Sequence, residues 1–349
     1  MANPISRLLR GLLGVYRFIR SFILNLLFLL LLLLLLSPLL PQSQAPVPAQ
    51  SALLLNPAGT LVEQRSFRTA LDQMLEGTGT SAGTGEVLLQ DVLDAIDLAR
   101  EDERINSLVI QTDAFAGGGL SQLRDVAAAL DEFRSSGKPV YALGASFSQA
   151  QYHLASQADE ILMNPLGMVE MEGFGSWQLY YRDALDKLGV TAHVFRVGEF
   201  KAAVEPYERN DMSPEARENY VQLLGEMWSL YLEDVSARRD LDAASINDYI
   251  NRLDQHLAEY DGDAARLAES FGLVDRLTSH PQSLAYLQSN IGTDGDSYRH
   301  IDYRNYLVRA RPAQPPASIP DRLALIVASG EIHDGESTSG SIGSRTLAG

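Results

Sequence analysis

The sequence predicts an α/β fold in which helices cover a largely parallel sheet. From Ser51 onward, short apolar runs bounded by turn residues alternate with stretches whose apolar residues recur at helical spacing. Strands that alternate with helices in this way are typical of βαβ units. The 349 residues, of which 46% are hydrophobic, suffice for one large or two modest domains.

The elements follow from these two patterns. Strands are expected at the apolar runs 52–56, 108–110, 140–143, 160–163 and 193–197. Helices are expected at 88–100, 120–133, 149–155, 177–188, 263–271 and 281–288. Ser213, Pro214 and Glu215 predict the start of a further helix, because they supply an N-cap, a proline in the first turn and an acid near the positive helix end. That helix should run to about Arg239.

The N-terminus predicts a membrane anchor. Residues 21–40 form an apolar stretch about as long as a bilayer-spanning helix. The preceding residues 1–20 contain four arginines and no acid, which places them in the cytoplasm and the body of the chain outside it. A cleaved signal peptide is the alternative. We favour an uncleaved anchor, because the apolar core is long and leads into a Pro/Gln/Ala tether at 41–50.

Composition excludes several classes of function. The chain has no cysteine, so it has neither disulfides nor thiolate metal sites. Its six histidines are scattered, which gives a metal site no support. A net charge of −17 argues against nucleic acid as a partner. Gly117–Gly119 is not a phosphate-binding loop, because no Gly-x-x-x-x-Gly-Lys pattern is present. We therefore expect no cofactor and no metal.

A second domain is expected to open near the C-terminus. Residues 310–320 contain four prolines and predict an extended linker after a first domain at 51–309. Beyond it, Leu325–Ile332 repeats the pattern of Leu54–Leu61, an apolar strand followed by a small residue and glycine. Residues 321–349 then begin a truncated second domain. They are too few to bury a core, so Glu331–Gly349 should be disordered or misplaced.

Lysine is rare in this chain, and the rarity singles out Lys201. The three lysines are Lys138, Lys187 and Lys201, whereas the other basic side chains are arginines. A buried lysine can lose its proton near neutral pH and an arginine cannot. Lys138 lies in a turn and Lys187 near a helix end, but Lys201 is flanked by Phe200 and an Ala-Ala-Val run. Lys201 is either a surface lysine whose stem covers apolar neighbours or a catalytic base.

The segment Phe195–Pro214 resembles the lysine segment of the signal peptide peptidase A family, the membrane-anchored serine peptidases of bacteria. Phe115–Gly118, Phe133–Tyr141 and Gln149–Ala155 resemble the same family. The resemblance implies a crotonase-like αβ spiral of the ClpP superfamily with a helical extension, preceded by one transmembrane helix. The long form of the family carries two such domains in tandem. It also implies a Ser/Lys dyad, whose lysine corresponds to Lys201.

The resemblance places the nucleophile outside this chain. The serine belongs to the second domain of the family, and Gln149 stands at the matching place in the first. The amide of Gln149 is not a nucleophile. Ser146 and Ser148 are interpreted as loop or N-cap residues. Gly117–Gly119 matches an oxyanion loop, but without a serine beside it we interpret it as structural.

A lysine can act as a base only when it is neutral, which requires apolar surroundings. Glu199 and Glu205 would keep the proton on the amine of Lys201 if they faced it. At least one of them should therefore face solvent or an arginine such as Arg209. Without a second domain to cover it, Lys201 should be partly exposed to water.

The resemblance also implies partners and location. It predicts apolar signal-peptide or membrane-derived peptides as substrates, a tetramer, and a single-pass protein of the bacterial inner membrane with a periplasmic body. A catalytically inactive peptide-binding or scaffold protein is the main alternative. A crotonase-type acyl-thioester enzyme would share the fold class, but the anchor and the lack of a CoA-binding feature argue against it.

Overall fold

The computed structural model describes residues 17, 19–32, 46–66, 85–198, 200–311, 330–337 and 341–348. The chain forms two units, residues 1–46 and 47–349. In the first unit, the described residues between 19 and 32 are helical. In the described part of the chain, no helix combines the length and hydropathy that crossing a bilayer requires. Residues 33–40 of the predicted anchor and 41–45 of the tether lie outside the described residues, so the anchor stays a prediction.

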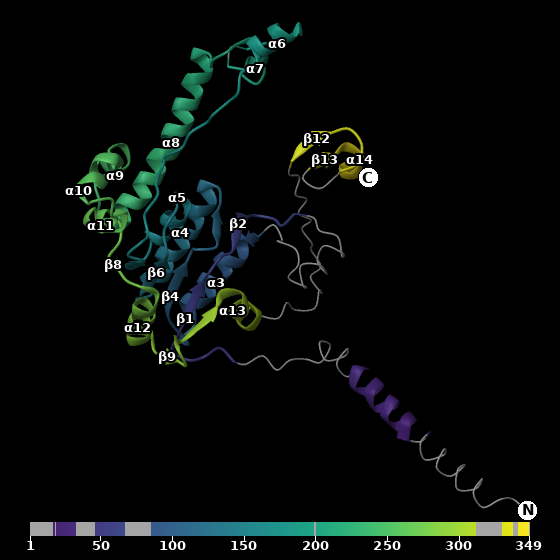
Figure 1. Ribbon diagram of the computed structural model, residues 1–349, viewed down its shortest axis with the longest axis vertical. Coiled ribbons are helices and arrows are strands. Elements are labelled where there is room, and N and C mark those ends of the chain that lie inside the picture. The colour runs from purple at the N-terminus through teal and green to yellow at the C-terminus, as the bar shows by residue number, and fades with distance from the viewer. Residues whose placement is uncertain are drawn as a thin grey trace, which may run out of the picture. The chain divides into compact units, whose positions relative to one another are not determined.

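A six-stranded parallel sheet forms the centre of the second unit, in the order β11-β1-β4-β6-β7-β8 (Figure 1). The strands are β1 (Ser51–Leu55), β4 (Ile105–Gln111), β6 (Val140–Gly144), β7 (Glu160–Met163), β8 (Arg276–Leu277) and β11 (His300–Asp302). β1 and β6 are buried along their whole length, as expected when both faces of a parallel sheet are covered. The α/β class and the parallel sheet are confirmed.

A second, three-stranded parallel sheet adjoins the first. It consists of β2 (Gly59–Val62), β3 (Glu86–Leu88) and β5 (Phe115–Gly117), in the order β3-β2-β5. β1 leads into β2 and β4 leads into β5 through short turns, so strands that are neighbours in the first sheet have continuations that pair in the second. Gly59 has φ 109° and Gly117 has φ 115°, backbone angles that favour glycine.

Helices cover both faces of the larger sheet. On one face α3 (Leu89–Glu101) and α4 (Leu120–Ser135) pack against each other and against alternate strand residues such as Leu53 and Leu108. On the other face α12 (His280–Ile291) packs on the residues between them, such as Leu54 and Val109. The alternation follows from the two-residue period of a strand.

The remaining described elements surround this core. They are α5 (Gln149–Ala155), α8 (Pro214–Arg239), α9 (Ala243–Asn251), α10 (Leu253–Glu259), α11 (Ala264–Ser270), α13 (Tyr303–Ala310) and the hairpin of β9 (Thr293–Asp294) and β10 (Ser297–Tyr298). α8 contacts α4 and α5. Its predicted bounds are confirmed, and Ser213 caps it by accepting the Ala216 N–H at 3.1 Å.

Two predictions between β7 and α8 are wrong. The helix expected at 177–188 is helical only as α6 (Arg182–Leu188), and α7 (Glu205–Glu208) was not foreseen. Residues 193–197 form no strand. An isolated apolar run becomes a strand only where a sheet edge is available to it, and β8, from residues 276–277, takes the edge of β7.

The C-terminal residues are more ordered than expected. β12 (Glu331–His333) and β13 (Ser341–Gly343) form a parallel pair, and α14 (Ser344–Ala348) follows. The expectation of disorder is therefore wrong for the described residues 331–337 and 341–348. Gly330 has φ 113°, close to the 109° of Gly59, its counterpart in the repeat. Residues 312–329, which include most of the linker and the start of the repeat, lie outside the described residues.

Lys138 has a structural role that yields a first prediction. Its Nζ donates hydrogen bonds to the carbonyl oxygens of Ala99, Arg100 and Asp102, at 2.8, 2.9 and 2.8 Å. These carbonyls end α3, where a positive charge is favourable. We expect Lys138→Met to destabilise the chain by about 2 kcal/mol, because it strands these carbonyls. Urea unfolding measures the change. Lys187→Met, at an exposed lysine of α6, should stay within about 0.5 kcal/mol, and equal effects would contradict this role.

Candidate active site

Lys201 lies in an irregular segment between Gly198 and α7, and its side chain is exposed. Its backbone is held at both ends: its N–H donates to the Gly198 carbonyl at 3.4 Å, and Arg196 Nη1 donates to its carbonyl at 3.0 Å. Gly198 has φ 111° and lies under the aliphatic stem, since a Cβ there would be 3.7 Å from Lys201 Cγ. Among the described residues, which exclude Glu199, the ammonium has no hydrogen bond or ion pair. Lys201 is thus exposed to water, as expected in the absence of a second domain to cover it.

Glu205 faces an arginine, as expected, but it is Arg196 instead of Arg209. Its side chain is 1% exposed, and one carboxylate oxygen accepts the Ser213 N–H at 3.1 Å. The other oxygen lies 3.5 Å from Arg196 Nη1. Arg209 pairs with Asp211 at 3.0 Å. Glu205 therefore joins α7 to the start of α8 and is not a counterion of Lys201, whereas Glu199 lies outside the described residues.

The environment of Glu205 predicts a pH dependence of stability. Burial raises the pKa of the carboxyl, but the hydrogen bonds from Ser213 and the charge of Arg196 outweigh it, so the pKa of Glu205 is lowered. A group with a lowered pKa stabilises the fold above its unfolded value and loses that contribution as pH falls through the folded value. We expect Glu205→Gln to lower Tm by about 2–4 °C at pH 7, and by less toward pH 4. Calorimetry over this range measures the difference.

The control for Glu205 is Glu208, which lies one turn away and 4.0 Å from the same Arg196, with its side chain partly exposed. Glu208→Gln should change Tm by less than about 1 °C at either pH. A Glu205→Gln effect that is constant from pH 7 to pH 4 would show that its ionisation does not stabilise the junction.

Gln149 occupies the place where the resemblance aligns a nucleophile, at the start of α5. Its Oε1 accepts the N–H groups of Glu172 and Gly173 at 3.0 and 2.8 Å, and its Nε2 donates to the Gly173 carbonyl at 3.2 Å. The amide thus fastens an extended segment to α5. An amide is not a nucleophile and cannot attack a peptide bond.

The neighbouring serines have the structural roles expected of them. Ser148 is the N-cap of α5, where its N–H donates to Gln151 Oε1 at 2.9 Å. The Ser146 hydroxyl accepts the Met168 N–H at 3.2 Å in the adjoining loop. Neither contacts a histidine or lysine among the described residues, so neither has a base to activate it.

The glycine loop is explained by packing. A Cβ on Gly118 would lie 2.8 Å from Leu61 Cβ, which shows how closely β2 approaches the loop. The Gly119 N–H donates to Gln122 Oε1 at 2.9 Å as α4 begins. This N–H is already occupied, which favours the structural interpretation of Gly117–Gly119 over an oxyanion hole in this domain.

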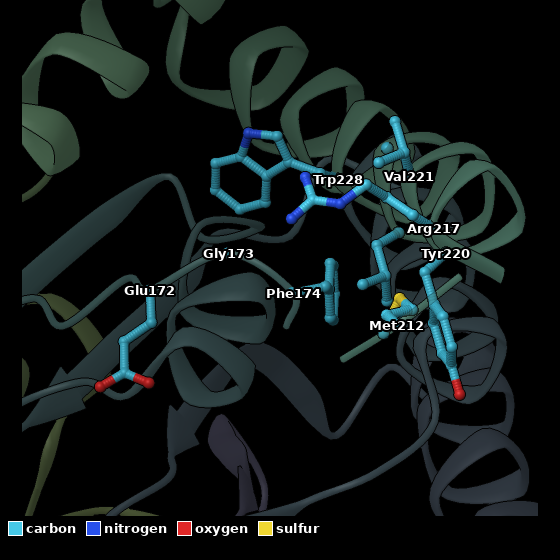
Figure 2. Close-up of a pocket in the computed structure, with 10 residues that line it drawn as sticks. Glu172, Gly173, Phe174, Met212, Arg217, Tyr220, Val221 and Trp228 are labelled. Carbon is cyan, nitrogen blue, oxygen red and sulfur yellow. The ribbon is translucent and has the colours of Figure 1, made fainter. Parts of the chain in front are cut away.

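Two hollows lie along α8. The first, which we call the Phe200 pocket, has a volume of about 510 Å³ and is lined in part by Phe200 and Ala202, the two chain neighbours of Lys201. Its lining residues come from the Lys201 segment and α8, and include Phe200, Ala202, Tyr220 and Leu223. The second, the Trp228 pocket, has a volume of about 490 Å³ and lies between residues 172–174 and α8 (Figure 2). Its position in the fold was not foreseen from the sequence.

Large apolar side chains are exposed between β7 and α8. Trp177 is 90% exposed and Phe195 is 96% exposed. Others in this stretch are Leu179, Leu188, Val190 and Val197. Such a concentration of exposed apolar surface is typical of a site that another protein surface covers. Among the described residues, no three His, Asp or Glu side chains gather where a metal could bind.

The candidate site lies in a part of the chain that matches a known family model. Residues 132–288 match the family model described as Peptidase family S49. The chain is 38% identical over 342 residues to "Protease 4" of Salmonella typhi, a match that covers 96% of this chain and 54% of that protein. It is 34% identical over 339 residues to "Protease 4" of Haemophilus influenzae, covering 95% and 55%. The chain thus spans about half the length of the curated relatives it matches.

Two solved structures also match part of the chain. A membrane-bound stomatin-specific protease, 1510-N, matches with a TM-score of 0.36 and 13% identity, over 72% of this chain and 98% of that one. An enoyl-CoA hydratase/isomerase from Marinobacter aquaeolei matches with a TM-score of 0.31 and 12% identity, over 58% of this chain and 64% of that one.

Proposed function

The chain carries a domain of peptidase family S49, and from that premise we propose that it is the first domain of a serine endopeptidase that cleaves remnant signal peptides. In this proposal Lys201 is the general base of a Ser/Lys dyad, and the nucleophilic serine lies in a second domain. The observation that carries it is the contrast between two positions. In the family's lysine segment, Lys201 has no side-chain partner among the described residues, whereas the amide of Gln149, where a serine would be needed, is bonded to residues 172–173.

The second domain is proposed to begin within residues 321–349. β12 and β13 repeat the arrangement of β2 and β3: a glycine with φ above 100°, a strand, a parallel partner strand and then a helix. Ile332 pairs with Ile342 as Leu61 pairs with Val87. The two parallel sheets of the first domain also agree with the proposed crotonase-like spiral.

Docking of this second domain would give Lys201 the water-free surroundings and the serine partner that it lacks. A lysine amine becomes a better base when water is removed from it, because desolvation disfavours the charged form. Phe200 and Ala202, the chain neighbours of Lys201, line the Phe200 pocket and offer apolar walls. A domain placed over the Phe200 pocket would exclude water from the amine and bring a serine hydroxyl to it. The same pocket suits an apolar substrate side chain.

The proposed setting is the bacterial inner membrane. Residues 21–40 would span it, with the N-terminus cytoplasmic and the body periplasmic, as the arginines of residues 1–20 suggest. The exposed apolar side chains between residues 177 and 197 would be covered by further copies, which supports a homo-oligomer such as a tetramer. Apolar peptides from the membrane are the proposed substrates.

A serine-reactive fluorophosphonate probe tests the proposal. We expect Ser146 and Ser148 to remain unlabelled in the chain of residues 1–349, because neither is bonded to a histidine or lysine among the described residues. The proposed protein with both domains, which we call the full-length protein, should be labelled on a serine of its second domain. Lys201→Ala should slow that labelling at least about 100-fold. Labelling of Ser146 or Ser148 in the shorter chain would contradict the placement of the nucleophile.

An inactive peptide-binding scaffold is the second candidate, because the amide of Gln149 is bonded to residues 172–173 and is not a nucleophile. This candidate predicts no labelling of the full-length protein and no peptide hydrolysis, while apolar peptides still bind. The probe therefore separates the two candidates in one experiment.

A further inference from the structure

Arg217 is the cation at the wall of the Trp228 pocket, as far as the described residues show. It lies near the start of α8, its side chain is exposed, and its guanidinium has no hydrogen bond or ion pair among the described residues. The other lining side chains are mostly apolar. They are Phe174, Met212, Tyr220, Val221, Leu224 and Trp228. The pocket therefore presents one positive charge beside an apolar surface.

The charge of this pocket is unusual for the chain. The net charge is −17, and many arginines are neutralised by carboxylates, as Arg196 is by Glu205 and Arg239 by Asp275. The other charged side chain at the pocket is Glu172. Figure 2 shows its carboxylate directed away from Arg217, and no ion pair joins the two. An anion approaching this acidic protein would therefore find a favourable site at Arg217.

The apolar wall of the pocket is rigid before any ligand binds. The Trp228 and Tyr231 rings stack at 5.1 Å between centroids, and Phe174 meets both rings edge-on at 6.4 and 6.5 Å. Trp228 Nε1 donates to Asn247 Oδ1 at 3.0 Å, which fixes the indole further. A preformed wall costs little ordering on binding. At about 490 Å³ the pocket has the size of a small-ligand site.

We propose that the Trp228 pocket binds the C-terminal end of an apolar peptide, with Arg217 paired to the terminal carboxylate. The guanidinium offers two parallel N–H donors that match a carboxylate, and the aromatic wall receives the last one or two apolar side chains. The inference rests on the proposed function, since each hydrolysis of a peptide bond leaves a new terminal carboxylate on an apolar product. The pocket would hold such a product or a previously cut substrate.

The test compares two forms of one peptide. A fluorescein-labelled apolar hexapeptide with a free C-terminal carboxylate, and its C-terminal amide, are titrated with the full-length protein carrying Lys201→Ala, and anisotropy gives Kd. We expect the acid to bind about 10-fold more tightly than the amide. Arg217→Gln should weaken the acid to the level of the amide, with little effect on the amide itself.

Arg266→Gln is the matched control, because Arg266 is an exposed arginine of α11 with no ion pair among the described residues. It removes the same charge and should leave the preference for the acid intact. Equal affinities for acid and amide, or a preference that survives Arg217→Gln, would overturn the proposal. So would competition by laurate as effective as that by the unlabelled acid peptide, since it would indicate a fatty-acid site.

The two proposals fail separately. A full-length Lys201→Ala protein that still hydrolyses peptide would refute the role of Lys201 as general base. Binding of the peptide acid to the Trp228 pocket would be unaffected. Conversely, loss of the acid preference in an active enzyme would refute only the role of Arg217.

Discussion

Replacing Lys201 by alanine is expected to reduce peptide hydrolysis by the full-length protein at least about 100-fold near pH 7.5, because a positioned general base contributes about 10²–10⁴. The serine hydroxyl would keep its proton and remain a poor nucleophile. The measurement is kcat/KM for a fluorogenic peptide with apolar residues around the scissile bond. Since Lys201 makes no side-chain bond within the described residues, its removal should leave Tm unchanged. Loss of activity would then reflect loss of the general base and not unfolding of the protein.

Two further variants make this prediction specific. Lys201→Arg keeps the positive charge but cannot give a neutral base, so it should be as inactive as the alanine variant. Lys187→Ala removes the exposed lysine of α6 and should keep activity within about twofold. If Lys201→Ala retains activity within about threefold of the unaltered protein, Lys201 is not the base.

The strong local patterns of the sequence predicted the core of the fold. β1, β4, β6 and β7 correspond to apolar runs of the sequence, and their apolar side chains are buried in the core. The start of α8 was predictable because its N-cap serine, its proline and its acid are consecutive residues that each favour the first turn of a helix. β8 and β11 were missed, since they have two and three residues and exist only through pairing with β7 and β1. Pairing across more than a hundred residues leaves no local signal.

The candidate site was predictable to a smaller extent. The rarity of lysine pointed to Lys201, and the chemistry of the amide removed Gln149 from consideration. The partner of Glu205 was misplaced, because Arg209 is nearer in sequence, whereas the turn before α7 brings Arg196 to it. The Trp228 pocket was missed altogether: Phe174 and Trp228 meet only because Gln149 fastens residues 172–173 beside α8.

The position of α8 depends on Arg239, and this dependence gives the largest expected effect on stability. Its side chain is 8% exposed and holds the Asp275 carboxylate with two bonds, at 2.7 and 3.0 Å. It also donates to the Gly272 carbonyl at 2.9 Å, and Asp275 in turn accepts the Ile161 N–H of β7 at 2.8 Å. We expect Arg239→Ala to destabilise the chain by about 3–5 kcal/mol, measured by urea unfolding, because it strands a partly buried carboxylate.

If the stranded charge is the cause, a second change should relieve it. Asp275→Asn removes the charge and keeps an oxygen for the Ile161 N–H, so the double variant should be at least about 1 kcal/mol more stable than Arg239→Ala alone. Arg266→Ala, at the exposed arginine of α11, should cost less than about 0.5 kcal/mol. An Arg239→Ala cost below about 1 kcal/mol would mean that other contacts anchor α8, such as the packing of Tyr231 and Val235 and the pairing of Asp234 with Arg124.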